Sequence, residues 1–150
     1  MDLQQLGLLH PRPGGDPDNH RLKAANLAAV AADFHAYGAR RLVVVGSVEL
    51  PSQLRLYAEA LPSATMTLCR LHASPGSLSD RIRRRARGDG PPIAGDPLRE
   101  QPAAVLTAAH EAAVAQADAL ERAGLGDLRL DTDGRSVTGL TEEIAATIGW

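Results

Sequence analysis

The feature that most constrains the fold is an apolar run without polar alternation, Arg41-Leu42-Val43-Val44-Val45, which ends at Gly46-Ser47. Such a run is typical of a strand covered on both faces, as in a parallel sheet. Residues 65–71 and 128–131 predict two further strands. Helical periodicity, caps and stop signals predict helices at 19–37, 52–61, 78–87, 103–123 and 137–148. The sequence therefore predicts a three-layer α/β fold, a parallel sheet with helices on both faces.

Length and composition narrow the class of protein further. The chain has 150 residues, of which 44% are hydrophobic, 23% charged and only 3% aromatic, with a net charge of -2. These values fit one domain and exclude a disordered or fibrous protein. Within this domain we expect a mobile, lid-like subregion at 76–102. Cys69 is the single cysteine, so a disulfide framework is excluded. There is no long apolar run and no basic leader, so we expect a cytoplasmic protein without a membrane partner.

Five arginines lie within the short segment 81–87. On a helical period Arg81, Arg84 and Arg85 share one face, so their guanidinium groups could converge on a phosphate group. The glycines that follow would let the helix hinge. The alternative is a solvated basic helix face. A nucleic-acid interface is not expected, because the net charge is negative and no aromatic residue is interleaved.

Two further polar segments are candidate binding sites. The first comprises Asp131, Thr132, Asp133 and Ser136, at the carboxyl end of a predicted strand, where parallel sheets bind ligands. Its alternative is an Asx turn followed by a helix cap. The second lies at a predicted helix start and comprises Asn19, His20, Arg21 and Lys23. An anionic substrate could dock there, and the alternative is helix capping with solvated basic side chains. No histidine spacing predicts a metal site.

Taken in order, these segments resemble the P-loop kinase family, in particular small actinobacterial proteins described as nucleoside-monophosphate-kinase-like or ATP-binding. The resemblance spans nearly the whole chain, and the matching segments are 2–7, 16–23, 42–46, 68–71, 81–87 and 131–134. It implies ATP-dependent phosphotransfer to a small molecule or nucleotide, with ATP and Mg²⁺ as cofactors. It also implies that Asp2 is catalytic and contacts the acceptor, that Arg81, Arg84 and Arg85 bind phosphate, and that residues 131–136 lie near the nucleotide base.

The chain departs from that family at the phosphate-binding loop. Gly-x-x-x-x-Gly-Lys-Ser/Thr is absent, and Lys23, the only lysine, follows Arg21-Leu22 rather than glycine. Gly46-Ser47 stands where many such enzymes carry a magnesium-directing Asp. We expect an N-terminally truncated, inactive form. Alternatively, residues 42–45 pair directly with 65–71, or another polypeptide supplies the missing strand.

Two other functions are compatible with the sequence. One is a non-catalytic α/β interaction module that binds an acidic partner through its arginine-rich helix. The other is a complete enzyme that uses the edge formed by residues 131–133, although no nucleophile and base occur at a recognisable spacing.

Overall fold

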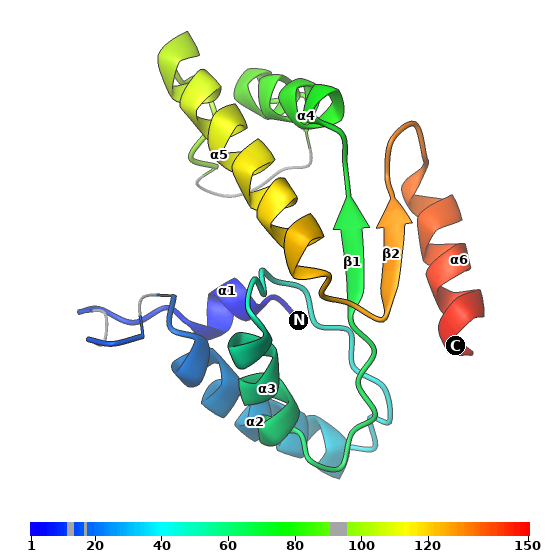
Figure 1. Ribbon diagram of the computed structural model, residues 1–150. Helices are drawn as coiled ribbons and strands as arrows, with labels where there is room; N and C mark the ends of the chain where they lie inside the picture. Colours follow the sequence, from blue (N-terminus) through cyan, green and yellow to red (C-terminus); the bar gives the residue numbers. More distant parts are fainter. Residues whose placement is uncertain (12–13, 17, 91–95) are drawn as a thin grey trace. The chain divides into compact units, whose positions relative to one another are not determined.

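The computed structural model describes residues 1–11, 14–16, 18–90 and 96–150 (Figure 1). Residues 12–13, 17 and 91–95 lie outside this description, and the last of these segments belongs to the lid-like subregion at 76–102. The described residues divide into two compact units, Met1–Met66 and Thr67–Trp150, where the sequence predicts a single domain.

The first unit, Met1–Met66, consists of three helices around a small apolar core. They are α1 (Leu3–Leu6), α2 (His20–Ala36) and α3 (Pro51–Ala60). Both α1 and α3 pack against α2. The core is formed by the buried side chains of Leu3, Ala24, Leu27 and Tyr57.

The apolar run 42–45 belongs to this unit and is extended, but it is not a strand of a sheet. Its only ladder contact among the described residues is an isolated parallel bridge between Asp2 and Val45. Around the bridge, Val45 N donates to Met1 O at 2.8 Å and Leu3 N donates to Val45 O at 2.8 Å. One face of the run packs on the core through Leu42 and Val44. The opposite face is open, because Val43 and Val45 are 57% and 62% exposed.

The second unit, Thr67–Trp150, holds a two-stranded parallel sheet. Strand β1 (Cys69–His72) pairs with β2 (Leu128–Asp131), with Cys69 opposite Leu128 and His72 opposite Asp131. Between the strands in sequence come α4 (Pro75–Arg87) and α5 (Ala103–Ala123), which pack against each other. The last helix, α6 (Val137–Ile148), follows β2 and runs beside it (Figure 1).

The predicted three-layer α/β fold is wrong. In the part of the chain that the structure describes, the sheet has two strands, and 42–46 is not one of them. The parallel pairing of the other two predicted strands is confirmed, although β1 begins at Cys69 rather than at residue 65. An apolar β-branched run predicts an extended and partly buried backbone, but strand formation also needs a paired neighbour along its length. Among the described residues, 42–46 have that neighbour only at Asp2.

Local sequence signals predict the ends of the helices more accurately than they predict the sheet. The bounds of α5 and α6 are those predicted, and each ends at a glycine in the left-handed region, Gly124 at φ 59° and Gly149 at φ 71°. Glycine has no Cβ penalty at such positions. The predicted start of α4 is wrong. Its cap is Ser74, whose hydroxyl accepts from Ser77 N at 3.3 Å, and Pro75 occupies the first turn.

Candidate functional site

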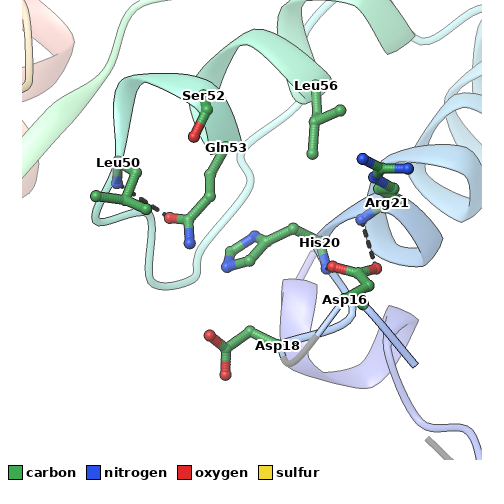
Figure 2. Close-up of a pocket in the computed structure, with 9 residues that line it drawn as sticks. Asp16, Asp18, His20, Arg21, Leu50, Ser52, Gln53 and Leu56 are labelled. Carbon is green, nitrogen blue, oxygen red and sulfur yellow. Dashed lines mark hydrogen bonds between the residues drawn. The ribbon is translucent and has the colours of Figure 1, made fainter. Parts of the chain in front are cut away.

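A cavity of about 390 Å³ opens in the first unit, between the start of α2 and the start of α3 (Figure 2). Its size lies in the range of small-molecule sites. The lining combines charged, polar and apolar side chains. It consists of Gly15, Asp16, Asp18, His20, Arg21, Leu50, Ser52, Gln53 and Leu56.

Asp16 closes the amino-terminal end of α2 with its side chain. One carboxylate oxygen accepts from His20 N at 2.8 Å and the other accepts from Arg21 N at 2.9 Å. Asn19, in the left-handed region at φ 56°, turns the chain between Asp16 and the helix. The first amides of α2 are therefore already bonded to a carboxylate, and they do not provide the anion site that the sequence predicts at this helix start.

His20 is a buried side chain in the cavity wall. It is 7% exposed, and its Nδ1 lies 2.7 Å from the hydroxyl of Tyr57 on α3. Burial, with the nearby charge of Lys23, lowers the pKa of His20 below 6.5. Burial and Asp16 raise the pKa of Tyr57 to about 12. Both side chains are therefore neutral at pH 7. Within the described residues Nε2 of His20 has no hydrogen-bond partner, and the ring points between Gln53 and Asp18 (Figure 2).

The opposite wall is the first turn of α3. Gln53 Oε1 accepts from Glu49 N at 2.8 Å and from Leu50 N at 3.1 Å. Because the amide oxygen is used in this way, the amide nitrogen faces the cavity (Figure 2). Ser52 adds a hydroxyl, and Leu50 and Leu56 add apolar surface.

The four residues predicted as a substrate site divide into two groups. His20 and Arg21 line the cavity, whereas Asn19 and Lys23 are buried against α1. Asn19 Nδ2 donates to Gly7 O at 2.8 Å, and Lys23 Nζ donates to Gln4 Oε1 at 3.1 Å. Asn19 and Lys23 therefore hold α1 in place and do not line the cavity, and the alternative of a solvated Lys23 is wrong.

Asp2, the predicted catalytic residue, is an exposed N-cap. Its Oδ1 accepts from Gln4 N at 2.8 Å at the start of α1. Asp2 is not among the residues that line the cavity.

The three arginines predicted to bind phosphate have three separate partners. Arg81 Nη2 donates to Thr132 Oγ1 at 2.8 Å and to Thr132 O at 3.2 Å, just beyond the end of β2. Arg84 Nη2 donates to Asp89 O at 3.3 Å. Arg85 forms a bidentate pair with Asp96 at 2.8 and 3.0 Å, which lowers the pKa of that carboxyl group. Their guanidinium groups do not converge on one point.

Residues 131–136 form turn and cap contacts. Asp133 N donates to Asp131 Oδ1 at 3.0 Å, as in an Asx turn, and Ser136 Oγ accepts from Gly139 N at 3.1 Å to cap α6. Thr132 Oγ1 donates to His72 O at 2.7 Å. The Asp133 carboxylate accepts from Ser74 N at 3.2 Å, and hydrogen bonds from serine side chains lower its pKa. These contacts match the alternative prediction of an Asx turn and a helix cap.

The sequence did not reveal the α3 side of the cavity. Asp16 and Asp18 lie in the polar segment singled out at the start of α2, but Ser52 and Gln53 carry no motif of their own. Pro51 predicts the start of α3, yet nothing local predicts that this start faces residues 15–21.

The described part of the chain holds no group of three or more His, Cys, Asp or Glu side chains arranged to bind a metal ion. None of its helices is both long and apolar enough to cross a bilayer. Comparison with family models, with curated proteins and with solved structures finds no match to this chain.

Proposed function

We propose that this chain is a kinase-like protein related to the P-loop kinases, and that the cavity of the first unit binds the small molecule that accepts the phosphoryl group. The observation that carries this proposal is the cavity itself. Six of its nine lining residues are polar or charged and two are leucines, so it offers hydrogen-bonding groups beside a small apolar surface to a small polar molecule.

His20 gives the cavity a group suited to a hydroxyl ligand. Its ring is fixed by Tyr57 and is neutral at pH 7, so Nε2 can form a hydrogen bond with a ligand hydroxyl. A buried imidazole with a perturbed pKa in a cleft is a common feature of functional sites. His20 is therefore the residue that we expect to contact the reacting group of the acceptor.

The residues present do not fit ATP and Mg²⁺. The sequence has no Gly-x-x-x-x-Gly-Lys-Ser/Thr loop, and its single lysine, Lys23, is buried and bonded to Gln4. The part of kinase chemistry that this chain can supply is recognition of the acceptor. We expect no ATP turnover by the 150-residue chain.

A binding module for acidic partners is less well supported. Three of the five arginines on α4 lie near carboxylates of the same unit, in the pairs Arg83–Asp80, Arg85–Asp96 and Arg87–Asp89. Arg81 and Arg84 donate to Thr132 and to Asp89 O. Because carboxylates partly neutralise the helix, its attraction for an acidic partner is weaker than the sequence indicates.

The test is a ligand screen by NMR on the full chain, with a panel of sugars, amino sugars, amino alcohols, nucleosides and nucleoside monophosphates. We expect a saturable change in the amide signals of Asp18, Arg21 and Gln53. Leu56→Trp should fill the cavity and abolish that change. Leu8→Trp, at a position 75% exposed and outside the cavity, should preserve it.

Two results would contradict the proposal. One is a panel in which no compound moves the cavity signals. The other is steady magnesium-dependent ATP hydrolysis by the purified chain, because this would require a phosphate site that we do not identify.

A further inference from the structure

We infer that the cavity of the first unit selects a ligand that carries a primary ammonium group beside hydroxyl groups, as amino sugars and amino alcohols do, and that it discriminates against phosphorylated ligands. The inference rests on the proposed function, because it names the class of ligand for the same cavity.

The first argument is the balance of charge in the lining. The lining holds two carboxylates, Asp16 and Asp18, and one guanidinium, Arg21, while His20 is neutral. Lys23 and Glu49 do not line the cavity, and their charges act on His20 in opposite directions, with Lys23 the larger of the two. Against the lining itself a phosphate dianion would meet two carboxylates and one guanidinium, which is less favourable for a phosphate than for an ammonium group.

The second argument concerns the amino-terminal end of α2. Helix starts bind anions because their first amides lack partners. Here Asp16 bonds the amides of both His20 and Arg21, at 2.8 and 2.9 Å. The Asp16 carboxylate thus occupies the position that a ligand phosphate would take, and it offsets the positive end of the helix dipole.

Asp18 is the group that we expect to bind the ammonium. Its side chain is exposed at the cavity mouth, and in the described part of the chain its carboxylate accepts no hydrogen bond. In Figure 2 it lies on the far side of His20 from Arg21. An ammonium on Asp18 would therefore place the rest of the ligand toward the imidazole.

The remaining lining suits hydroxyl groups. His20 Nε2, the Ser52 hydroxyl and the Gln53 amide nitrogen offer hydrogen bonds, and the apolar side chains of Leu50 and Leu56 can cover the carbon face of a sugar ring. His20 Nε2 is not among the buried side-chain atoms that lack a partner in the described part of the chain, so it is open to solvent, and a ligand hydroxyl there would replace water.

The experiment compares matched ligands by NMR titration of the full chain at neutral pH. The pairs are glucosamine with glucose, galactosamine with galactose, and ethanolamine with ethylene glycol; glucose 6-phosphate and AMP are the anionic probes. We expect the amine to bind about fivefold more tightly than its hydroxyl partner in at least one pair, since an exposed ion pair contributes little more than that. The anionic probes should bind more weakly than glucose. Asp18→Asn should remove the preference, and Asp33→Asn, on α2 outside the cavity, should retain it.

The outcomes separate this inference from the proposed function. If no pair favours the amine, if Asp18→Asn keeps the preference, or if glucose 6-phosphate or AMP binds the cavity more tightly than the amines, the inference is overturned. In the last case the cavity remains a small-molecule site. If no compound of the wider panel moves the cavity signals, both the inference and the proposed function are wrong.

Discussion

His20 Nδ1 and the hydroxyl oxygen of Tyr57 lie 2.7 Å apart, with the two rings edge to face at a centroid distance of 5.9 Å. His20 begins α2 and Tyr57 lies on α3, so the contact joins the two helices that wall the cavity. Only 7% of His20 and 4% of Tyr57 is exposed. The same burial that fixes this pair also disfavours a charge on either ring.

Acid should destabilise the first unit through His20. Because the pKa of His20 in the folded chain is below its unfolded value of 6.5, the unfolded chain binds a proton more readily. The contribution of His20 to stability is thus complete above pH 6.5 and is lost as the pH falls below it. We expect the urea midpoint of the wild type, measured by helical circular dichroism, to drop between pH 7.5 and about 5.5.

His20→Gln should flatten this pH dependence, since glutamine does not titrate. His35→Gln, at an exposed histidine of the same helix, is the matched control and should leave the dependence unchanged. An equal drop in wild type and His20→Gln would show that another group causes the acid sensitivity.

Tyr57 should titrate far above its ordinary range. Burial and the Asp16 carboxylate raise its pKa from 10.0 to about 12 in the folded chain. The neutral phenol is favoured by folding, so stability is lost as the pH rises from 10.0 toward 12. In a Tyr37→Phe background Tyr57 is the only tyrosine, and its tyrosinate absorbance should have its midpoint near pH 12. A midpoint that is the same with and without denaturant would contradict the buried position.

Substitutions of Asn19 should lower stability for two reasons, its left-handed backbone and the hydrogen bond of its side chain. It lies at φ 56°, and its buried amide donates to Gly7 O at 2.8 Å. Both Asn19→Gly and Asn19→Ala lose the hydrogen bond to Gly7 O. Glycine adopts the left-handed conformation without strain, whereas alanine keeps a Cβ that disfavours it. We expect both to lower the free energy of unfolding by about 1–3 kcal/mol. Asn19→Ala should be the less stable by about 1 kcal/mol.

Asn26→Ala is the control for this pair of variants. Its side chain also donates to a carbonyl of the first helix region, Leu6 O, but it is exposed and its backbone is helical. We expect a loss of at most about 1 kcal/mol. Equal stability of Asn19→Ala and Asn19→Gly would mean that the left-handed backbone carries no strain for alanine.

The sequence predicted those features that short-range signals control. The bounds of α5 and α6 are correct because their last turns end at Gly124 and Gly149, and the pairing of β1 with β2 follows from two apolar runs joined by helices. The strand predicted at 42–46 failed because an apolar run on both faces predicts burial but does not say whether a neighbouring strand pairs with it. Its neighbour is a short contact with Asp2 rather than a full strand.

Prediction of the candidate site from the sequence was likewise limited to contacts between residues close in the chain. His20 and Arg21 could be identified because polar residues cluster at the start of α2. Their partner wall at Ser52 and Gln53 is far along the chain, and no local pattern reports a contact over that distance. The burial of Asn19 and Lys23 was missed, although their four-residue spacing places them on one face of α2, toward α1.

Thr132 should matter for the stability of the second unit. Its buried hydroxyl donates to His72 O at 2.7 Å and accepts from Arg81 Nη2 at 2.8 Å, so it connects both strand ends to α4. Thr132→Val keeps the shape but removes both bonds, and we expect a loss of about 1–3 kcal/mol. The fluorescence of Trp150, the only tryptophan, is the measurement during urea unfolding. Thr141→Val, at an exposed threonine, should change stability by less than about 0.5 kcal/mol.

Gly46 should not tolerate a side chain, because Leu3 lies against it. A Cβ at position 46 would lie 2.8 Å from both Cβ and Cδ1 of Leu3, a core residue that is 4% exposed. We expect Gly46→Ala to lower the free energy of unfolding by about 1–3 kcal/mol, the usual cost of overpacking. Gly14→Ala, where a Cβ would have no neighbour within 4 Å among the described residues, should be neutral or slightly stabilising.

A double-mutant cycle with Leu3→Ala identifies the cause of that loss. Shortening Leu3 removes Cγ and Cδ1, two of the three atoms nearest to the added Cβ, so Gly46→Ala should cost less in the Leu3→Ala background than in the wild type. The family resemblance also implies a magnesium-directing aspartate directly after this apolar run. An aspartate at position 46 would have to displace Leu3, as an alanine there would. The cycle is read from urea unfolding by circular dichroism. Fully additive losses would show that Leu3 is not what excludes a side chain at position 46.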